Sequence, residues 1–442
     1  MLALQRSRSS HFQSIPKLAR HRLLSTLSEH ANNTPSYLSR PGWNTIKHVA
    51  RSVPTCVNLP DRGVLSVAGP GVGQFLDGLI SGKMPGDGSR QHLYTVFLNA
   101  KGRILYDVFL YSNAKSETEP GYLIEYDSRP SEAQSLLQML KRHLLRSKIR
   151  IRDVTEEYDV WALWNPNQLT YELGTEARTW ECHPTGVIEP VFDEEMEVQW
   201  GSSRWGSQPG PIIDRRAIGF GQRVLTKRGN TAPSISSSFD EGTLDDYRVH
   251  RYLNGVPEGI EDMPPTHVFP ANSSLDIMGA LTFKKGCHVG QEHLSRARHV
   301  NELRRRLFPV IIHREGESVN DARSTPKPRF PPGIEVSSRS LHEAQPTAAS
   351  RIKNQLVSNV HGVGLAMLRT EDVASCEDGK RVLEFESPVQ EGGETVKWVV
   401  TPSKPSWWPD PRRGGVFVKN SAENIAVKSL DDLLLLQSLS QN

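Results

Sequence analysis

Residues 285–292 read Lys285-Gly286-Cys287-His288-Val289-Gly290-Gln291-Glu292 and place one cysteine between two glycines. Glycine lets a backbone turn sharply and approach a partner closely, so this cysteine is expected at an accessible bend. The neighbouring Lys284, Lys285 and His288 supply cationic groups, which stabilise a thiolate, the form of cysteine that acts as nucleophile and metal ligand. The alternative is a cysteine packed inside a glycine-bounded turn, because free cysteine is among the most buried residue types.

The four cysteines of the chain are widely scattered, at Cys56, Cys182, Cys287 and Cys376. No CxxC pair exists, which argues against a zinc ribbon and against a self-contained iron–sulfur domain with clustered ligands. Scattered cysteines fit a reducing compartment better than a disulfide scaffold. The chemistry at Cys287 is therefore expected to involve a single thiol of this chain.

Length and charge set the broad class. A chain of 442 residues has room for two or three domains. Its formal net charge is +3 and much of the positive excess lies at the N-terminus, so no nucleic-acid surface is expected. No run of apolar residues is long enough to cross a bilayer, so no transmembrane segment is expected.

The N-terminal segment has the composition of a mitochondrial transit peptide. The first acidic residue is Glu29, and the residues before it are rich in arginine and serine. Such basic, hydroxylated and acid-poor segments direct proteins to mitochondria, whereas a secretory signal needs a continuous apolar stretch. The alternative is a disordered basic tail. We assign residues 1–40 to this segment and expect the mitochondrial matrix as the location.

Short strands and few helices are expected in residues 41–302. Strands are predicted at Arg62–Val67, Tyr94–Leu98, Ile104–Tyr111, Tyr122–Tyr126 and Tyr158–Trp164. The residue types of Asn99–Gly102 predict a hairpin turn. Residues 131–146 carry leucines at three- and four-residue spacing and predict one amphipathic helix, which Ser131 caps. Strands without regular βαβ alternation favour an α+β fold with antiparallel sheets.

Composition divides the chain after residue 302. Residues 228–240 have the polar composition of a disordered insertion, and residues 315–350 that of a flexible one. Short apolar runs follow at Gly362–Leu368, Val382–Glu386 and Val396–Val400, and they predict a small β-barrel. The C-terminal domain is assigned to residues 303–442, with a last helix expected at Asn424–Ser438.

The motif around Cys287 resembles the signature of the YgfZ family. The signature reads Lys-Gly-Cys-aromatic-x-Gly-Gln-Glu followed by an arginine, which is Arg296 here, and His288 replaces the aromatic residue. Tyr94–Asp107, Tyr247–Gly259 and Gly364–Arg369 resemble further segments of the family, so the likeness covers roughly residues 55–420. The resemblance implies an aminomethyltransferase (T-protein)-like, folate-binding-type body with antiparallel sheets and a C-terminal β-barrel.

The resemblance also implies a function. YgfZ-type proteins assist iron–sulfur cluster assembly, and with the N-terminal composition the likeness indicates a mitochondrial factor for maturation of 4Fe-4S proteins. Its expected partners are A-type iron–sulfur scaffold proteins and 4Fe-4S client apoproteins. Because one cysteine cannot hold a cluster that needs several thiolates, no stably bound cluster is expected in the isolated chain.

Within this hypothesis each motif residue has a role. Cys287 is the functional thiol and a transient metal ligand that is shared with a partner. Lys285 tunes its charge, and the two flanking glycines, Gly286 and Gly290, give the partner access. Gln291, Glu292 and Arg296 are expected to hold the loop or to contact the partner.

The alternative function is a tetrahydrofolate-dependent aminomethyltransferase-like enzyme. Tyr94 offers a flat face to a pterin, Asp107 a carboxylate near its nitrogens, and Arg103 and Arg251 pair with a glutamate tail. Tyr106 stands where the T-protein pattern has a second aspartate, and Asn272 where the YgfZ pattern has a glutamate. Both departures count against the enzyme.

A third hypothesis is a metal site made of Cys287, His288, His293 and His299, whose side chains bind zinc or iron in other proteins. Adjacent residues of an extended segment point to opposite faces, so Cys287 and His288 cannot easily reach one ion. Histidines on a polar surface are the simpler interpretation.

Overall fold

The computed structural model describes residues 51, 53–86, 89–113, 120–165, 179–191, 204–230, 239–300, 302–317, 327–341, 352–388, 394–405, 408–409 and 416–417. The transit peptide predicted at 1–40, most of the insertion at 228–240 and the helix expected at 424–438 lie outside the described residues. No helix among the described residues is both long and apolar enough to cross a membrane.

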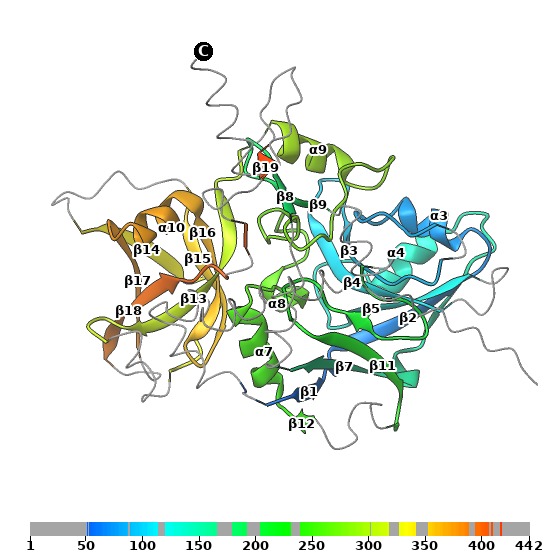
Figure 1. Cartoon of the computed structure of the whole chain (residues 1–442), viewed down its shortest axis with the longest axis horizontal. Helices are drawn as coiled ribbons and strands as arrows, with labels where there is room; N and C mark the ends of the chain where they lie inside the picture. The colour runs from blue at the N-terminus through cyan, green and yellow to red at the C-terminus, as the bar shows by residue number, and fades with distance from the viewer. Residues whose placement is uncertain are drawn as a thin grey trace, which may run out of the picture.

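Two five-stranded sheets form the body, on the right of Figure 1. The first sheet is antiparallel, in the order β3 (Leu93–Leu98), β4 (Ile104–Ser112), β5 (Gly121–Asp127), β2 (Arg62–Ala68), β6 (Arg150–Asp153). The second has the order β10 (Ile212–Ile213), β11 (Gln222–Lys227), β7 (Tyr158–Trp164), β1 (Thr55–Asn58), β12 (Asp240–Glu241), and its β1–β12 pair is parallel. The predicted α+β class with antiparallel sheets is confirmed.

Helices of the body are short. They are α3 (Val72–Asp77), the 3-10 turn η2 (Thr155–Glu157), α4 (Leu136–His143), α7 (Leu244–Leu253), α8 (Gly259–Asp262) and α9 (Gln291–His299). The helix predicted at 131–146 is shorter than expected. The Ser131 hydroxyl accepts from Ala133 N two residues on, a turn that competes with a helix, and Ser135 caps α4 instead by accepting from Gln138 N.

The predicted turn between β3 and β4 is present. Asn99 Oδ1 accepts from Lys101 N at 2.9 Å and from Arg103 N at 3.0 Å. Gly102 N donates to Asn99 O at 2.9 Å, and Gly102 has a φ of +70, a left-handed value that favours glycine. The hairpin therefore follows from its own turn residues.

A six-stranded closed barrel forms the C-terminal part, on the left of Figure 1. Its order is β13 (Arg305–Arg314), β16 (Val363–Arg369), β15 (Asn354–Val360), β14 (Glu335–Ser340), β17 (Arg381–Pro388), β18 (Thr395–Pro402), and α10 (Thr370–Glu377) follows β16. The buried Trp398 ring lies 4.9 Å from that of Phe330 inside the barrel. The predicted β-barrel is confirmed.

Strand β14 lies in the region where the sequence predicts a flexible excursion, at residues 315–350. That prediction is wrong for residues 335–340, which pair with both β15 and β17. The strand is too polar to be recognised, because Val336 is its one apolar side chain, and that side chain is buried in the barrel.

The body and the barrel meet through α7 and α8, which lie between them in Figure 1. Val249 and Tyr252 of α7 form an apolar cluster with barrel residues that include Leu307 and Leu365. Asp262 at the end of α8 accepts from Ser358 Oγ of β15 at 2.6 Å and also binds Arg251. One buried carboxylate therefore connects the two parts.

A small sheet completes the structure near α9. It contains β8 (Thr179–Cys182) and β9 (Ile188–Val191) as an antiparallel pair, with β19 (Val416–Phe417) parallel to β8. The segment that carries Cys287 runs from the body into α9, beside this sheet.

Candidate functional site

Cys287 is the exposed cysteine of this chain. Cys56 and Cys182 are buried, and Cys376 is partly buried. The pKa of the Cys376 thiol is raised by burial to about 11, and burial also raises those of Cys56 and Cys182. A partner or an electrophile in solution therefore meets Cys287 first.

Lys285 fastens the Cys287 segment to the body. Its ammonium donates to three backbone carbonyls, those of Asp77 at 2.6 Å, Gly82 at 2.8 Å and Ile80 at 2.9 Å. The Lys285 side chain is 2% exposed, and burial lowers its pKa although Asp77 opposes the shift. The ammonium of Lys285 thus points into the body, so the Lys285 side chain anchors the segment. Its expected effect on the charge of the thiol stays a prediction.

The two glycines of the motif have different structural roles. Gly290 has a φ of +84, and a side chain there would lie 2.9 Å from Asn99 O and from Leu98 Cβ. Its backbone packs directly on the β3–β4 turn. Gly286 is exposed, and a side chain there would meet nothing within 4 Å. Gly290 is required by packing, whereas Gly286 leaves open space next to Cys287.

The start of α9 closes the segment. Gln291 Oε1 accepts from His288 N at 3.1 Å. His288 Nδ1 lies 3.2 Å from Gly286 O, and since a carbonyl only accepts, we assign the ring proton to Nδ1. His288 Nε2 is buried and finds no partner among the described residues, and burial lowers the pKa of the ring. Burial therefore favours the neutral ring of His288 over a cation beside the thiol.

A cavity of about 570 Å³ lies along this segment and α9. Four of the predicted motif residues border it: Lys285, Gln291, Glu292 and Arg296. Cys287, Gly286 and Gly290 do not. The volume is in the range of small-molecule sites, and the mixed charges of Glu292 and Arg296 suit a polar ligand or a partner loop.

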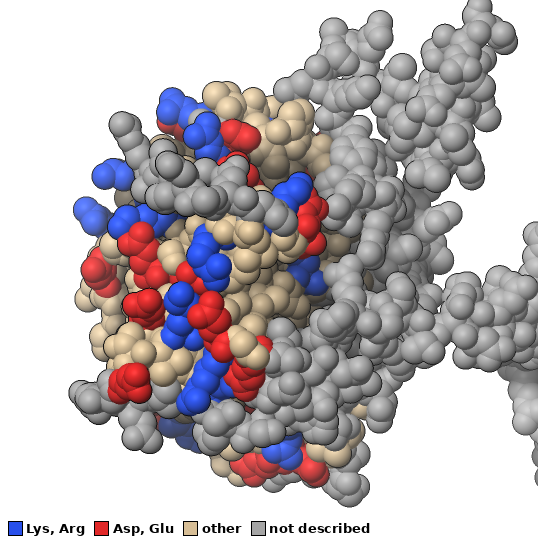
Figure 2. Space-filling model, turned by 90° about the vertical axis from the view of Figure 1, so that its left-hand side faces the viewer, with Lys and Arg blue, Asp and Glu red and all other residues tan. Residues whose placement is uncertain are grey.

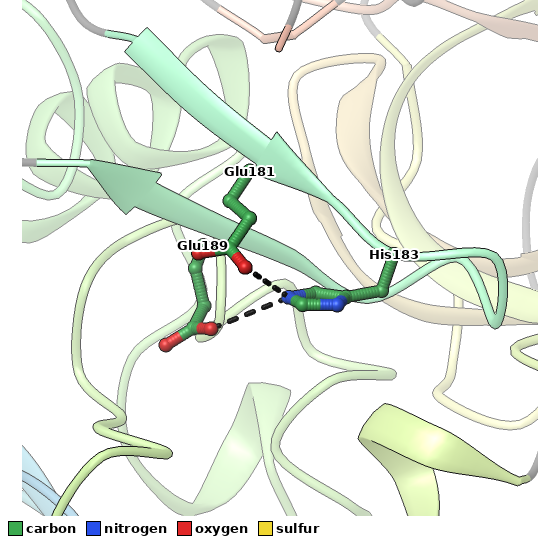
Figure 3. A group of neighbouring side chains, drawn as sticks. All are labelled: Glu181, His183 and Glu189. Carbon is green, nitrogen blue, oxygen red and sulfur yellow. Dashed lines mark hydrogen bonds and ion pairs between the residues drawn. The ribbon is translucent and has the colours of Figure 1, made fainter. Parts of the chain in front are cut away.

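An ion-pair cluster holds the far end of α9, and Figure 3 shows three of its members. His183 Nε2 lies 3.3 Å from Glu189 Oε2 and 3.7 Å from Glu181 Oε1. The Arg298 guanidinium of α9 lies 3.0 Å from Glu189 and 3.3 Å from Glu181. Lys284, beside the motif, reaches Glu181 at 3.5 Å.

This cluster was missed by the sequence analysis, because Arg298 is remote in sequence from the β8–β9 hairpin. Glu181, His183 and Glu189 have metal-ligand types within 4.8 Å of one another. However, Arg298 already places a positive charge among the two carboxylates. The cluster stabilises the position of the Cys287 segment, because Lys284 before it and Arg298 after it both form ion pairs with the β8–β9 hairpin.

The hypothesis of a Cys287, His288, His293 and His299 metal site finds no support among the described residues. His293 stacks on Phe269, with ring centroids 6.4 Å apart. His299 is exposed at the opposite end of α9, roughly 12 Å along the helix axis from its first residue. Among the described residues, the side chains of metal-ligand type that lie within 4.8 Å of one another are those of Glu181, His183 and Glu189.

The four candidate folate residues do not meet in one cleft. Tyr94 is 0% exposed, between Phe109 and Trp205. Arg251 is buried in its pair with Asp262. Arg103 lies elsewhere, over the Phe269 ring at 4.1 Å.

Asp107 is also internal and fully engaged. Its Oδ2 accepts from Arg62 at 3.3 Å and its Oδ1 accepts from Gly259 N at 3.0 Å. Burial raises the pKa of Asp107, and Arg62 opposes that shift. Asn272, which stands at the position of the family's glutamate, donates to Arg305 O at 2.6 Å instead.

A buried charge network, also missed by the sequence analysis, lies around Asp107. Glu258 accepts from Tyr247 OH at 2.8 Å and contacts Arg216 Nη2 at 2.8 Å and Arg223 Nη2. Burial alone would raise the pKa of Glu258, but the two arginines hold it well below its usual range. No local pattern reveals these pairs, because each joins different strands and helices.

One small cavity lies beside this network. The cavity that Arg62, Arg251 and Glu258 border has about 50 Å³, the scale of a water molecule rather than of a cofactor site. Of the four predicted folate residues Arg251 borders this cavity, and Tyr94 OH is buried without a hydrogen-bond partner among the described residues. Tetrahydrofolate binding stays a prediction.

Residues 304–410 match the family model described as "CAF17, C-terminal beta-barrel domain". Over 338 residues the chain is 31% identical to "Iron-sulfur cluster assembly factor IBA57 homolog, mitochondrial" of Cryptococcus neoformans, which covers 74% of this chain and 86% of that protein. It is 30% identical over 362 residues to the human "Iron-sulfur cluster assembly factor IBA57, mitochondrial", covering 80% of this chain and 85% of that protein.

A solved structure, that of the glycine cleavage system aminomethyltransferase T from Bartonella henselae, is similar with a TM-score of 0.49 and 14% identity. That similarity covers 81% of this chain and 87% of the other.

Proposed function

The chain belongs to the family of mitochondrial iron–sulfur cluster assembly factors named IBA57, and we propose that it supports maturation of 4Fe-4S proteins through the Cys287 thiol. Membership carries the general role in iron–sulfur cluster assembly. The restriction to 4Fe-4S proteins, the action in the mitochondrial matrix and the role of Cys287 are the parts we propose. The acid-poor composition of the first residues supports the location.

The observation that carries the proposal is the presentation of Cys287. The thiol is exposed, while Lys285 and Gly290 hold the segment on both sides of it against the body. An exposed thiol on an anchored segment can meet a partner without unfolding. The open space at Gly286 gives that partner room to approach.

The chemistry we propose is ligand exchange. The Cys287 thiol loses its proton, and the thiolate binds an iron of the cluster as another ligand leaves that iron. No change of oxidation state is needed. Since one thiolate cannot hold a cluster by itself, the remaining ligands come from the partner, for which we propose an A-type scaffold protein, and then from the client apoprotein.

A replacement series in the native cell tests this function. Cells depleted of the protein are complemented with the wild type, with Cys287→Ser, or with Cys376→Ser as a matched control. Mitochondrial aconitase, a 2Fe-2S enzyme and glycine cleavage are assayed together. We expect Cys287→Ser alone to leave aconitase inactive, with 2Fe-2S activity retained and with wild-type amounts of the variant protein.

Two outcomes would contradict the proposal. Full aconitase activity with Cys287→Ser would remove the thiol from the mechanism. Selective loss of glycine cleavage on depletion would instead support the aminomethyltransferase-like alternative.

A further inference from the structure

A basic surface lies far from Cys287 in sequence, on the segment that leads from α4 into β6. It consists of Lys141, Arg142, Arg146, Lys148, Arg150 and Arg152, all of them exposed. No acidic residue interrupts the chain between Glu132 and Asp153. We call these six residues the basic surface.

Acidic partners are scarce on this surface. Among the described residues the one ion pair of its members joins Arg152 to Glu157 at 3.8 Å. The barrel face in Figure 2 is different, because blue and red side chains alternate over it. Ion pairs there include Arg339 with Glu384 at 2.9 Å and Lys353 with Glu335 at 2.6 Å. The basic surface therefore keeps an uncompensated positive field, which attracts anions.

A single large apolar side chain stands among these cations. Leu145 is 92% exposed, between Arg142 and Arg146 in sequence. Its φ of +45 lies in the left-handed region, which is unfavourable for a leucine. Both features are costly in water. An exposed leucine next to cations in sequence suits the interface of a membrane, where apolar side chains enter and cations meet anionic headgroups.

The same surface contains a hollow. A cavity of about 870 Å³ lies over the outer face of β2 and β6, and Lys148, Arg150, Arg152 and Lys227 are among the residues that border it. The floor includes Ser66 and Ala68, which pair with Arg152 and Arg150 in the sheet. Glu157 also borders the hollow and pairs with Arg152 at 3.8 Å and with Lys227 at 3.3 Å. Lys148 and Arg150 have no ion pair among the described residues, and they suit the phosphate of a lipid headgroup.

We propose that the basic surface docks this protein on a membrane that contains anionic phospholipids. Leu145 enters the interface, and the cations around the hollow bind the headgroup phosphates. The segment 141–152 contains no Phe, Tyr or Trp, and the ring of Tyr158 at the hollow is covered by the Lys227 ammonium at 4.0 Å. A lipid surface therefore fits it better than a single-stranded nucleic acid does. The proposal does not depend on the role of Cys287.

Sedimentation of the full-length protein with vesicles tests the proposal. One set is phosphatidylcholine alone, and the other contains about 30 mol% anionic phospholipid, a charge density for which polybasic segments gain affinity. We expect binding to the anionic vesicles alone, and we expect salt to weaken it. The triple variant Arg142→Gln, Arg146→Gln, Lys148→Gln should bind at least tenfold more weakly. The control Lys353→Gln, Lys380→Gln, Lys397→Gln removes the same charge from the barrel and should bind as the wild type does.

Fluorescence tests the role of Leu145 separately. In the Leu145→Trp variant the emission should shift to the blue on mixing with anionic vesicles, whereas Leu341→Trp, at an exposed site on the barrel side of the chain, should show no shift. Equal binding by the two triple variants, or binding to neutral vesicles as strong as to anionic ones, would overturn the proposal. So would retarded migration of RNA by the wild type without any vesicle binding, which would make this a nucleic-acid surface.

Discussion

The Cys287 segment and the interior around Asp107 were both predicted as sites, yet they treat their polar groups in opposite ways. In the interior, Asp107 is engaged by Arg62 and Gly259, and Glu258 by Arg216, Arg223 and Tyr247. At the Cys287 segment the lysine is buried and the thiol is left outside. In the first arrangement both carboxylates are engaged, although Arg216 Nη1 and Arg223 Nε and Nη1 have no hydrogen-bond partner among the described residues. In the second arrangement the thiol is exposed to a partner.

The comparison teaches where chemistry remains possible in this fold. The carboxylates of the interior are held by neighbouring arginines, and the cavity that Arg62, Arg251 and Glu258 border has only about 50 Å³. The anchored thiol of Cys287 is open to the outside. We therefore expect substitutions in the interior to change stability, and substitutions at the segment to change the presentation of Cys287.

The largest effect is expected from Glu258→Gln. The change leaves Arg216 and Arg223 without their shared carboxylate in the interior, so the free energy of unfolding should fall by about 3–5 kcal/mol. Denaturant titration measures it. Glu335→Gln, which breaks an exposed pair with Lys353, is the control and should cost less than about 0.5 kcal/mol. Equal losses in the two variants would show that the interior network contributes no more than an exposed ion pair does.

The buried His250 should make the free energy of unfolding depend on pH in the acid range. This ring is stacked between Trp164 and Phe220, and burial lowers its pKa from 6.5 to about 4. Below pH 6.5 the unfolded chain binds a proton that the folded chain excludes, so stability falls as the pH drops, by up to about 3 kcal/mol near pH 4. Unfolding curves between pH 7 and pH 4 measure this loss. His250→Gln keeps a donor for Phe220 O and should flatten this dependence; an unchanged slope would assign it to other groups.

At the segment, the two glycines give a matched pair. Gly290→Ala places a side chain against Asn99 O at a left-handed φ and should cost about 2–3 kcal/mol. Gly286→Ala meets open space and should cost less than about 0.5 kcal/mol. Thermal unfolding compares them. If Gly286→Ala were the more damaging of the two, the segment would not be anchored as described.

The smallest expected effect comes from the adjacent lysines. Lys285→Met deprives three carbonyls of their donor and should cost about 1–2 kcal/mol, with faster amide hydrogen exchange in residues 282–290. Lys284→Met removes an ion pair of a largely exposed side chain and should change both quantities little. Hydrogen exchange followed by mass spectrometry distinguishes the two. Identical exchange in both variants would argue against the anchoring role of Lys285.

Local patterns predicted the elements whose causes are local. Strand β7 has the predicted bounds Tyr158–Trp164, and the Asn99–Gly102 turn follows from its own residues. Prediction was less successful where a choice depended on neighbours, as with Ser135 rather than Ser131 as the cap of α4. Strand β14 was missed because five of its six residues are polar and its partners lie elsewhere in the chain.

The candidate site likewise has features that follow from local sequence and features that depend on distant residues. The motif identified the segment and its cysteine, but the direction of the Lys285 side chain depends on carbonyls more than 200 residues earlier in the chain. The charge network around Glu258 and the ion pairs of Arg298 are likewise long-range. Residue types alone therefore grouped Tyr94, Arg103 and Arg251, which among the described residues have separate surroundings.

The carboxylate of Asp262, which joins Arg251 to Ser358, limits how the chain can be divided. A truncated polypeptide that ends before the barrel would leave that carboxylate with one of its two side-chain donors and would expose the apolar side of α7. Such a fragment should aggregate when produced by itself, and it should recover on co-expression with the missing half. The body and the barrel each stabilise the other through this contact.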